Sequence, residues 1–160
     1  MQQYKQEYVS GVSALSKGNY IEAILHFEKS ISLAKATGLI STDDTFETAY
    51  FNLGQAKRES RKFTEAIADY QKALSLNPKL ESAYLKLAEC CFEIETYEAI
   101  EIAINTLKTC TRYFPQNKAA FMNLGIAYLK IGDKDGARTA FYSAKRLGNT
   151  DADRFIREWC

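Results

Sequence analysis

The fold is decided by residues 50–78, which read YFNLGQAKRESRKFTEAIADYQKALSLNP. Residues 121–144 repeat this skeleton 71 residues later: an aromatic residue, then Leu-Gly, Ala, another aromatic residue and Ala stand at the same spacings. Tyr84, Leu87 and Ala88 begin a third copy between the two. A fixed period of about 34 residues predicts stacked pairs of helices, each of which buries its apolar face against its neighbours.

Turn signals divide the chain into helices. Gly18, Gly132 and Gly148 precede polar residues in turn-like pairs, and Pro78 and Pro115 stand where a helix cannot continue. Between these joints apolar residues recur at intervals of three and four, and alternating strand patterns are nearly absent. We therefore expect an all-α chain. Its helices are predicted near residues 4–17, 20–37, 43–60, 63–76, 80–94, 97–113, 117–131, 134–147 and 150–159.

The repeated residues resemble the tetratricopeptide repeat (TPR) pattern, in which an aromatic residue is followed by Leu-Gly, Ala, Phe or Tyr, Ala and Pro. The resemblance implies an α-solenoid, a right-handed superhelix, built from four helix-turn-helix repeats in a single domain over residues 1–160. The repeats would span about 4–46, 47–80, 81–117 and 118–151, followed by a capping helix over about 150–160. The third repeat is three residues longer, and we place its extra turn around Glu93 to Tyr97.

In such a stack, small residues are expected where helices cross closely, and large residues are expected to fill the remaining space. Gly54 and Gly125 stand where two helices of one repeat are expected to cross closely, so a side chain there must be tiny. Tyr70 and Phe141 are expected to fill the gaps between neighbouring repeats. Arg61 occupies a turn where the pattern has Gly, at a small local cost.

The two ends of the chain differ. The last predicted helix carries one apolar stripe, at i, i+3, i+4 and i+7, formed by Ala152, Phe155, Ile156 and Trp159. Thr150 with Asp153 resembles a capping box, and Thr42, Asp43 and Thr45 offer caps for the third helix. No equivalent cap precedes Tyr4, so the first helix is expected either to expose apolar surface or to contact a partner or an upstream segment. Self-association through this uncapped repeat is one such possibility.

Composition excludes several classes of function. The chain has 160 residues, 46% of them hydrophobic, and a net charge of +1 from 21 basic and 20 acidic side chains. This balance gives no general field for nucleic acid or an anionic membrane, so neither is an expected partner. No apolar stretch approaches the roughly 20 residues that span a bilayer, and the N-terminus does not resemble a signal peptide. We expect a cytoplasmic protein.

No metal or cofactor is expected. Cys90 and Cys91 are adjacent, no Cys-x-x-Cys pair exists, and His26 is the only histidine. Cys91 and Cys110 are interpreted as buried small apolar groups, and Cys160 as an exposed thiol; this usage fits a reducing compartment.

The chain is not expected to be an enzyme. It has no phosphate-binding Gly-rich loop, no His-Glu-x-x-His and no Gly-x-Ser-x-Gly. Asp133 and Asp135 resemble a fragment of a calcium loop, but the remaining carboxylates are missing and a solvated turn is the better interpretation. His26 is interpreted as structural or solvated rather than catalytic.

What remains is a binding groove, because in TPR proteins the first helix of each pair lines the inner surface. By register, the lining residues are Tyr8, Val12, Phe51, Asn52, Gln55, Arg58, Leu85, Lys86, Glu89, Met122, Asn123 and Ile126. Such a set suits an extended peptide or an amphipathic helix of a partner protein. Asn52 and Asn123 share one repeat position and either bond a ligand backbone or are merely solvated. Phe51, Leu85 and Met122 either contact the ligand or take part in packing between helices.

Two other functions of helical-repeat proteins, chaperone binding and RNA binding, are less well supported by this sequence. Chaperone-binding TPR proteins clamp the C-terminal carboxylate of Hsp70 or Hsp90 with Lys, Asn, Asn, Lys and Arg, and these positions fall here on Tyr8, Val12, Asn52, Ser82 and Lys86. Asn52 matches, while Lys86 replaces Arg and loses its two-pronged geometry. Pentatricopeptide proteins, also helical repeats, read single-stranded RNA but tend to carry a basic groove. The sequence therefore predicts a non-catalytic scaffold or adaptor that binds a protein segment.

Overall fold

The computed structural model describes residues 3–36, 38 and 45–159. Within these residues all regular secondary structure is α-helical. The helices are α1 (Gln3–Ser16), α2 (Tyr20–Ala36), α3 (Thr45–Glu59), α4 (Phe63–Leu76), α5 (Glu81–Ile94), α6 (Tyr97–Tyr113), α7 (Lys118–Lys130), α8 (Lys134–Arg146) and α9 (Ala152–Trp159). Each begins and ends within two residues of its predicted position, so the all-α helical-repeat solenoid is confirmed for the part that the structure describes.

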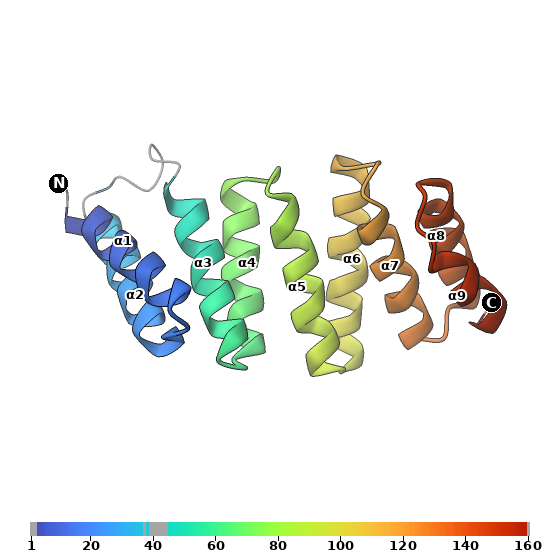
Figure 1. Cartoon of the computed structure of the whole chain (residues 1–160), viewed down its shortest axis with the longest axis horizontal. Helices are drawn as coiled ribbons and strands as arrows, with labels where there is room; N and C mark the ends of the chain where they lie inside the picture. Colours follow the sequence, from blue (N-terminus) through green and yellow to red (C-terminus); the bar gives the residue numbers. More distant parts are fainter. Residues whose placement is uncertain (1–2, 37, 39–44, 160) are drawn as a thin grey trace. The chain divides into compact units, whose positions relative to one another are not determined.

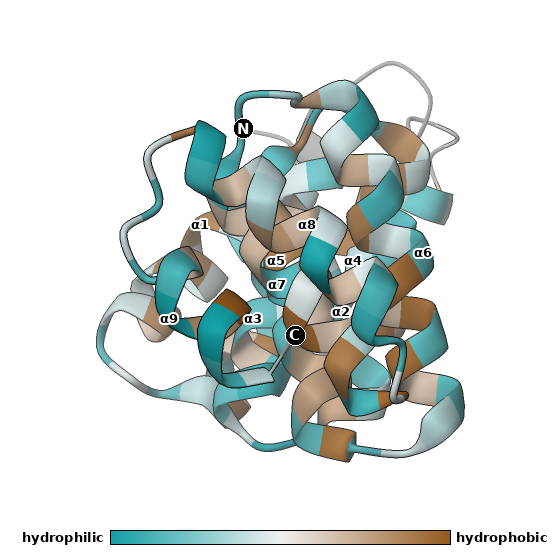
Figure 2. Cartoon of the chain, turned by 90° about the vertical axis from the view of Figure 1, so that its right-hand side faces the viewer, coloured by the Kyte–Doolittle hydropathy of each residue, from teal (hydrophilic) through white to brown (hydrophobic). Residues whose placement is uncertain are grey.

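The helices form two compact units, residues 1–83 and 84–160. In the first unit α1 packs on α2, α2 on α3 and α3 on α4; in the second, α6 packs on α7, α7 on α8 and α8 on α9. Figure 1 shows short connections between α1 and α2, between α3 and α4, and between the helices from α6 to α8, and Figure 2 shows hydrophilic and hydrophobic residues on the same helices. This amphipathic colouring is typical of helices that bury one face. The single domain over residues 1–160 stays a prediction.

Glycine allows the two helices of a repeat to cross closely. A Cβ atom added to Gly54 would lie 2.8 Å from the Tyr70 ring, and one added to Gly125 would lie 2.4 Å from the Phe141 ring. Both rings are 0% exposed. The need for a tiny residue is thus confirmed. Each ring packs against the first helix of its own repeat, and the Phe141 ring also lies 5.1 Å from the Phe155 ring of α9. That these rings fill the gaps between repeats stays a prediction.

A buried lysine joins three helices of the first unit. Lys57 of α3 lies 2.9 Å from Asp69 of α4, 3.4 Å from Glu28 of α2 and 3.6 Å from Glu65 of α4. Although burial acts to lower it, pairing with Asp69 and Glu28 raises the pKa of Lys57 above its usual 10.5. Lys57 therefore stays charged at neutral pH and links the first repeat to the second.

Most of the turns between helices use the left-handed backbone that favours glycine. Gly18, Gly132 and Gly148 have φ values of 77°, 80° and 82°. Arg61 and Glu95 adopt the same region, at 60° and 59°, without the freedom of glycine. The cost predicted at Arg61 therefore has a structural basis.

The third repeat is extended at the start of its second helix. Helix α6 has 17 residues, against 14 in α4. It begins at Tyr97, which lies at one edge of the region predicted for the extra turn, and the Thr96 hydroxyl accepts a hydrogen bond from the Ala99 N–H at 3.2 Å. The additional turn is therefore helical and capped.

The start of α9 is held differently from the prediction. The side-chain oxygen of Asn149 accepts hydrogen bonds from the backbone N–H groups of Asp151 and Ala152, at 3.0 and 3.2 Å. Asp153 instead pairs with Lys145 at 2.6 Å. The predicted capping box of Thr150 and Asp153 is therefore wrong, because Asn149 already supplies the acceptor and Lys145 engages the carboxylate.

Helix α9 covers the end of the second unit with part of its apolar stripe. Ala152 is buried, and Phe155 and Ile156 pack against the core formed by α7 and α8. The Phe155 ring lies 5.1 Å from that of Phe141. Trp159, the last residue of the predicted stripe, is 54% exposed.

The remaining predictions on single residues have mixed outcomes. Cys91 and Cys110 are buried, as predicted, and burial raises the pKa of Cys91 to about 12. The predicted caps at Thr42, Asp43 and the Thr45 side chain, and the thiol of Cys160, lie outside the described residues. Among the helices described, none has the length and apolar character needed to cross a membrane.

Candidate partner-binding faces

The first candidate face lies on α1 and α3 of the first unit. We define it by its predicted lining residues, Tyr8, Val12, Phe51, Asn52, Gln55 and Arg58. The Asn52 side-chain nitrogen donates a hydrogen bond to the Tyr8 hydroxyl at 3.2 Å, so the structure brings these two helices together on one face. Val12 is 39% exposed on the same helix as Tyr8.

The aromatic residues of the first face also serve packing. The Tyr8 ring lies 5.9 Å from the Phe27 ring, and the Phe51 ring lies 5.7 Å from the Tyr70 ring. Both Tyr8 and Phe51 are half-buried, and burial raises the pKa of Tyr8 above its usual 10.0 despite the hydrogen bond from Asn52. Much of this face is therefore already used inside the protein.

The second candidate face belongs to α5 and α7 of the second unit. It comprises the predicted residues Leu85, Lys86, Glu89, Met122, Asn123 and Ile126. Glu95, which follows α5, and Lys130, the last residue of α7, form an ion pair of 2.8 Å. These ends of the two helices are therefore neighbours.

Met122 and Lys86 are less available than the sequence suggested. Met122 is only 7% exposed and belongs to the core of the second unit, so of its two interpretations packing is the one that the structure supports. The Lys86 ammonium group donates to both carboxylate oxygens of Glu89, at 3.0 and 2.9 Å. Lys86 is therefore engaged by its own helix.

The amide of Asn123 differs from that of Asn52. Asn123 is half-buried on α7, and its side chain makes no hydrogen bond to any residue that the structure describes. Its equivalent in the second repeat, Asn52, is already bonded to Tyr8. At this shared repeat position, the Asn52 amide is therefore bonded within the protein, whereas the donors and acceptor of the Asn123 amide are not bonded to any described residue.

Sequence reasoning missed a pocket between α7 and α9. Its volume is about 610 Å³. Its lining is Ile126, Leu129, Lys130, Gly132, Lys134, Arg154, Phe155, Glu158 and Trp159. Among the residues predicted to bind a partner, Ile126 takes part. The apolar stripe of the last helix was the available signal, but from the sequence we assigned that helix to capping the last repeat and not to binding.

The described residues contain no candidate metal site, and their single histidine is engaged by neighbouring carboxylates. Across residues 3–36, 38 and 45–159, no group of three or more His, Cys, Asp or Glu side chains is placed to hold a metal ion. His26 belongs to α2, and its Nδ1 atom lies 2.8 Å from Oε2 of Glu7 on α1. Its Nε2 atom lies 3.9 Å from Oε1 of Glu22 on its own helix. These contacts agree with a structural role.

The first repeat exposes apolar side chains on both of its helices, and Val9 on α1 agrees with the exposure expected of the first helix. Val9, Ile21 and Leu25 are 58%, 62% and 63% exposed. Ile21 and Leu25 stand one helical turn apart on α2 and line the same shallow depression. Self-association through this repeat stays a prediction.

Comparison with known sequences identifies the repeat. Models described as tetratricopeptide repeat match residues 48–80 and residues 100–152, together more than half of the chain. A rice protein named SGT1 homolog is 34% identical over 55 residues, which are 34% of this chain and 15% of the relative. The photosystem I assembly protein Ycf3 of Cuscuta gronovii is 28% identical over 86 residues, 52% of this chain and 46% of the relative. The chain thus matches less than half the length of these relatives.

Solved structures share the fold over most of the chain. MamA superposes with a TM-score of 0.76 and 24% identity, over 95% of this chain and 82% of MamA. YrrB, described as a TPR protein with an unusual peptide-binding site, gives a TM-score of 0.78 and 18% identity, over 98% and 75%. The first TPR of Spaghetti (RPAP3), bound to the HSP90 peptide SRMEEVD, gives 0.64 and 17%, over 74% and 94%. At these identities the likeness shows the fold alone.

Proposed function

Because the chain belongs to the tetratricopeptide repeat family, we propose that it is a non-catalytic interaction module, a scaffold or adaptor that holds a peptide or helix of a partner protein. The observation that carries this proposal is the amide of Asn123, which is half-buried on α7 and makes no hydrogen bond to the described residues. Its donors and acceptor stay accessible at the surface, where they can bond the backbone of a ligand.

The surroundings of Asn123 support a protein ligand. A side-chain amide offers both donors and an acceptor, which matches the N–H and C=O groups of a peptide backbone. Ile126, one turn along α7, and Leu85 on α5 are half-buried apolar residues that can accept a side chain of the partner. The second face therefore combines apolar anchors with a directed polar contact. YrrB and the RPAP3 domain, both described with peptides or a peptide-binding site, are consistent with this class of ligand.

The chaperone-adaptor alternative is less well supported by the residues. The position that would grip a terminal carboxylate is Lys86, and its ammonium group is already bonded to both oxygens of Glu89. Val12 and Ser82 stand where that subfamily has Asn and Lys. An RNA ligand is disfavoured by the net charge of +1.

Affinity capture with matched variants tests the proposal. The bait is the full chain, compared with a face variant carrying Leu85→Ala and Asn123→Ala and a control carrying Lys108→Ala and Lys118→Ala, two exposed lysines of the same unit. We expect a protein that is retained by the wild type and the control and lost by the face variant, with all three equally helical. If every captured protein binds all three baits equally, the second face does not hold the partner.

A further inference from the structure

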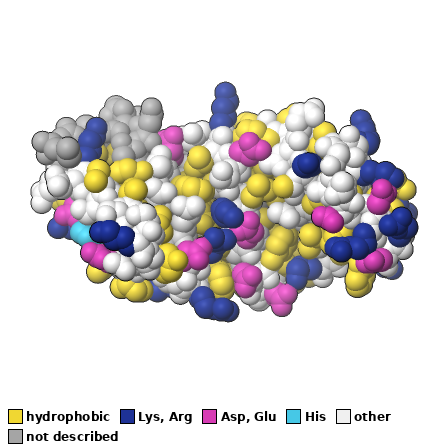
Figure 3. Space-filling view, viewed as in Figure 1, with side chains coloured by type: hydrophobic (Ala, Val, Ile, Leu, Met, Phe, Trp, Pro, Cys, Tyr) yellow, Lys and Arg dark blue, Asp and Glu magenta, His cyan; other side chains and the backbone are white. Residues whose placement is uncertain are grey.

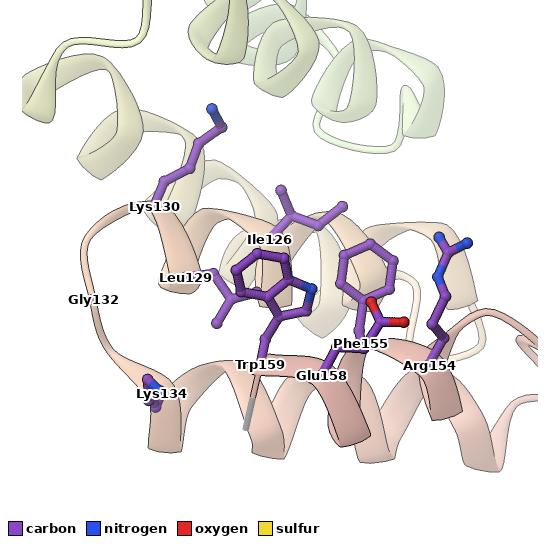
Figure 4. A pocket seen from close by; sticks show the side chains of 9 residues that line it. All are labelled: Ile126, Leu129, Lys130, Gly132, Lys134, Arg154, Phe155, Glu158 and Trp159. Atoms are coloured by element: carbon purple, nitrogen blue, oxygen red, sulfur yellow. The ribbon is translucent and has the colours of Figure 1, made fainter.

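The pocket between α7 and α9 has apolar walls. Ile126 and Leu129 project from α7, while Phe155 and Trp159, one helical turn apart on α9, face them (Figure 4). Leu129 and Phe155 also pack on the core of the second unit, so the floor is fixed. Trp159 is 54% exposed and stands over the opening. An indole left in water beside aliphatic side chains is a surface that a large apolar group can cover with a gain in free energy.

The rim of this pocket is basic. Lys130 and Lys134 lie toward the end nearest Gly132, and Arg154 lies at the opposite end (Figure 4). One carboxylate, Glu158, lines the pocket with them. Lys130 is paired with Glu95 at 2.8 Å.

Two of these three cations have no ion-pair partner in the part of the chain that the structure describes, although the Glu158 carboxylate also lines the pocket. Among the residues described, Lys134 and Arg154 form no ion pair, and Arg154 lies over the Phe155 ring with its guanidinium carbon 5.3 Å from the ring centre. In Figure 3, Lys and Arg side chains lie among Asp and Glu side chains on the part of the second unit that carries α8 and α9. The pocket is therefore apolar in its centre and has a cation without an ion pair at each end, so the acidic groups of a ligand would complement it.

We propose that this pocket binds an acidic segment of a partner protein in which one large apolar side chain is flanked by carboxylates. The apolar side chain would lie against Trp159 and Ile126. The carboxylates would pair with Arg154 at one end and Lys134 at the other, and Arg offers a carboxylate two parallel hydrogen bonds. Successive residues of an extended peptide are about 3.3 Å apart, so carboxylates placed before and after the anchor would lie toward opposite ends of the pocket.

This inference rests on the proposed function in taking the ligand to be a protein segment, and it assigns that segment a chemistry and a second contact site. The two sites are distinguishable, because the amide of Asn123 is not among the residues that line the pocket. A variant at Asn123 tests the second face, whereas variants at Lys134 and Arg154 test the pocket alone.

Trp159 provides the measurement, because it is the single tryptophan of the chain. The full chain is titrated with the capped peptide acetyl-Gly-Glu-Asp-Phe-Asp-Glu-Gly-amide, and the tryptophan emission is followed. We expect a saturable shift to shorter wavelength as the phenylalanine covers the indole. A peptide with Lys in place of every acidic residue, and one with Ala in place of Phe, should each bind at least about tenfold more weakly. The response to the acidic peptide should weaken with added salt.

Charge-reversal variants identify the rim. Lys134→Glu with Arg154→Glu should reduce the affinity for the acidic peptide at least about tenfold. The control, Lys108→Glu with Lys118→Glu, makes the same change of net charge at exposed sites outside the pocket and should bind as the wild type does. Asn123→Ala should also leave this titration unchanged.

Other results would overturn the proposal. Equal responses to the acidic and basic peptides, equal binding by the rim variant and the control, or no response to the acidic peptide would each contradict an acidic partner. Tryptophan emission that changes with protein concentration alone would assign the pocket to a second copy of the chain. A shift with vesicles of anionic lipid but not with the peptide would assign it to a membrane surface.

Discussion

At Gly125 the space for a side chain is already occupied by the Phe141 ring. An added Cβ atom would lie 2.4 Å from that ring, which is 0% exposed and cannot move aside freely. We predict that Gly125→Ala lowers the free energy of unfolding by about 1–3 kcal/mol, the usual cost of overpacking. Urea denaturation measures this change.

The matched control for Gly125 shrinks the opposing ring. In a Phe141→Leu background, Gly125→Ala should cost clearly less, because the side chain that it meets is smaller. If the cost is the same in both backgrounds, contact with the ring is not its cause.

Arg61 carries a backbone conformation that glycine adopts more easily. Its φ of 60° lies in the left-handed region, at a turn where other repeats of this chain have Gly18 and Gly132. We predict that Arg61→Gly raises the free energy of unfolding by about 0.5–1 kcal/mol. Arg61→Ala keeps the unfavourable φ and loses the contact of Arg61 with the Phe63 ring, so it should not stabilise. Equal gains from both substitutions in thermal or urea denaturation would contradict the backbone explanation.

At the scale of elements, Glu7 couples α1 to α2 in a pH-dependent way. Its carboxylate lies 2.6 Å from Lys29 and 2.8 Å from His26, and these hydrogen bonds hold the pKa of Glu7 below its usual 4.5. A carboxyl whose pKa is lower in the folded state stabilises that state above pH 4.5, and this contribution is lost as the pH falls through the folded-state pKa.

The resulting prediction compares wild type with Glu7→Gln. The wild type should be more stable at neutral pH, and the difference in urea midpoint should shrink as the pH falls below 4.5. Glu101→Gln, at an exposed site on α6, is the control and should show a small, flat difference. A difference for Glu7→Gln that does not change with pH would rule out the ion pairs as its source.

Helix α9 is predicted to stabilise the fourth repeat. Ending the chain after Asn149 removes Phe155 and Ile156 from the core and the contact of Phe155 with Phe141. Because repeats are stabilised by their neighbours, hydrogen exchange should become faster most of all in residues 118–149, while residues 3–36 keep their protection. Trp159→Ala should have little effect, since the indole is 54% exposed. An unchanged exchange profile after truncation would mean that α9 does not contribute to the core.

The helices and their crossings could be predicted because they depend on local signals. The spacing from Gly54 to Tyr70, repeated from Gly125 to Phe141, specifies where two helices must touch, and turns at glycine specify where they end. The cap of α9 could not be predicted with the same rules, since Asn149, Thr150 and Asp151 all supply acceptors. Only the position of Lys145 decides that Asp153 is engaged elsewhere.

The candidate sites were predicted less completely, because register gives the side of a helix and not the partner of a side chain. Asn52 and Asn123 occupy the same position of their repeats, yet only the Asn52 side chain is hydrogen-bonded to a described residue, at the hydroxyl of Tyr8. Likewise, Lys86 donates a hydrogen bond to Glu89, and Met122 is buried in the core of the second unit. The pocket at Trp159 depends on how far α9 lies from α7, which no spacing in the sequence states.

At the scale of the whole molecule, two compact units each present a candidate face formed by first helices of their repeats. The first face is largely satisfied by its own contacts, as the bond between Asn52 and Tyr8 shows. On the second face, the Asn123 amide is not bonded to any described residue. In the adjoining pocket, Lys134 and Arg154 form no ion pair with a described residue. Because the net charge is only +1, the chain has no strong overall electrostatic field. We therefore expect local groups such as these to select the partner.

The dissociation constant of the captured partner segment tests the central claim most directly. It is measured by calorimetry for the wild type, Asn52→Ala, Asn123→Ala and the Lys118→Ala control. We predict that Asn123→Ala weakens binding by about 0.5–1.5 kcal/mol, the net worth of a hydrogen bond, with an unchanged melting temperature. Asn52→Ala should instead lower the melting temperature, because it loses the bond to Tyr8. If Asn123→Ala binds the segment as tightly as the wild type, the second face does not recognise the partner backbone and the proposed mode of binding is wrong.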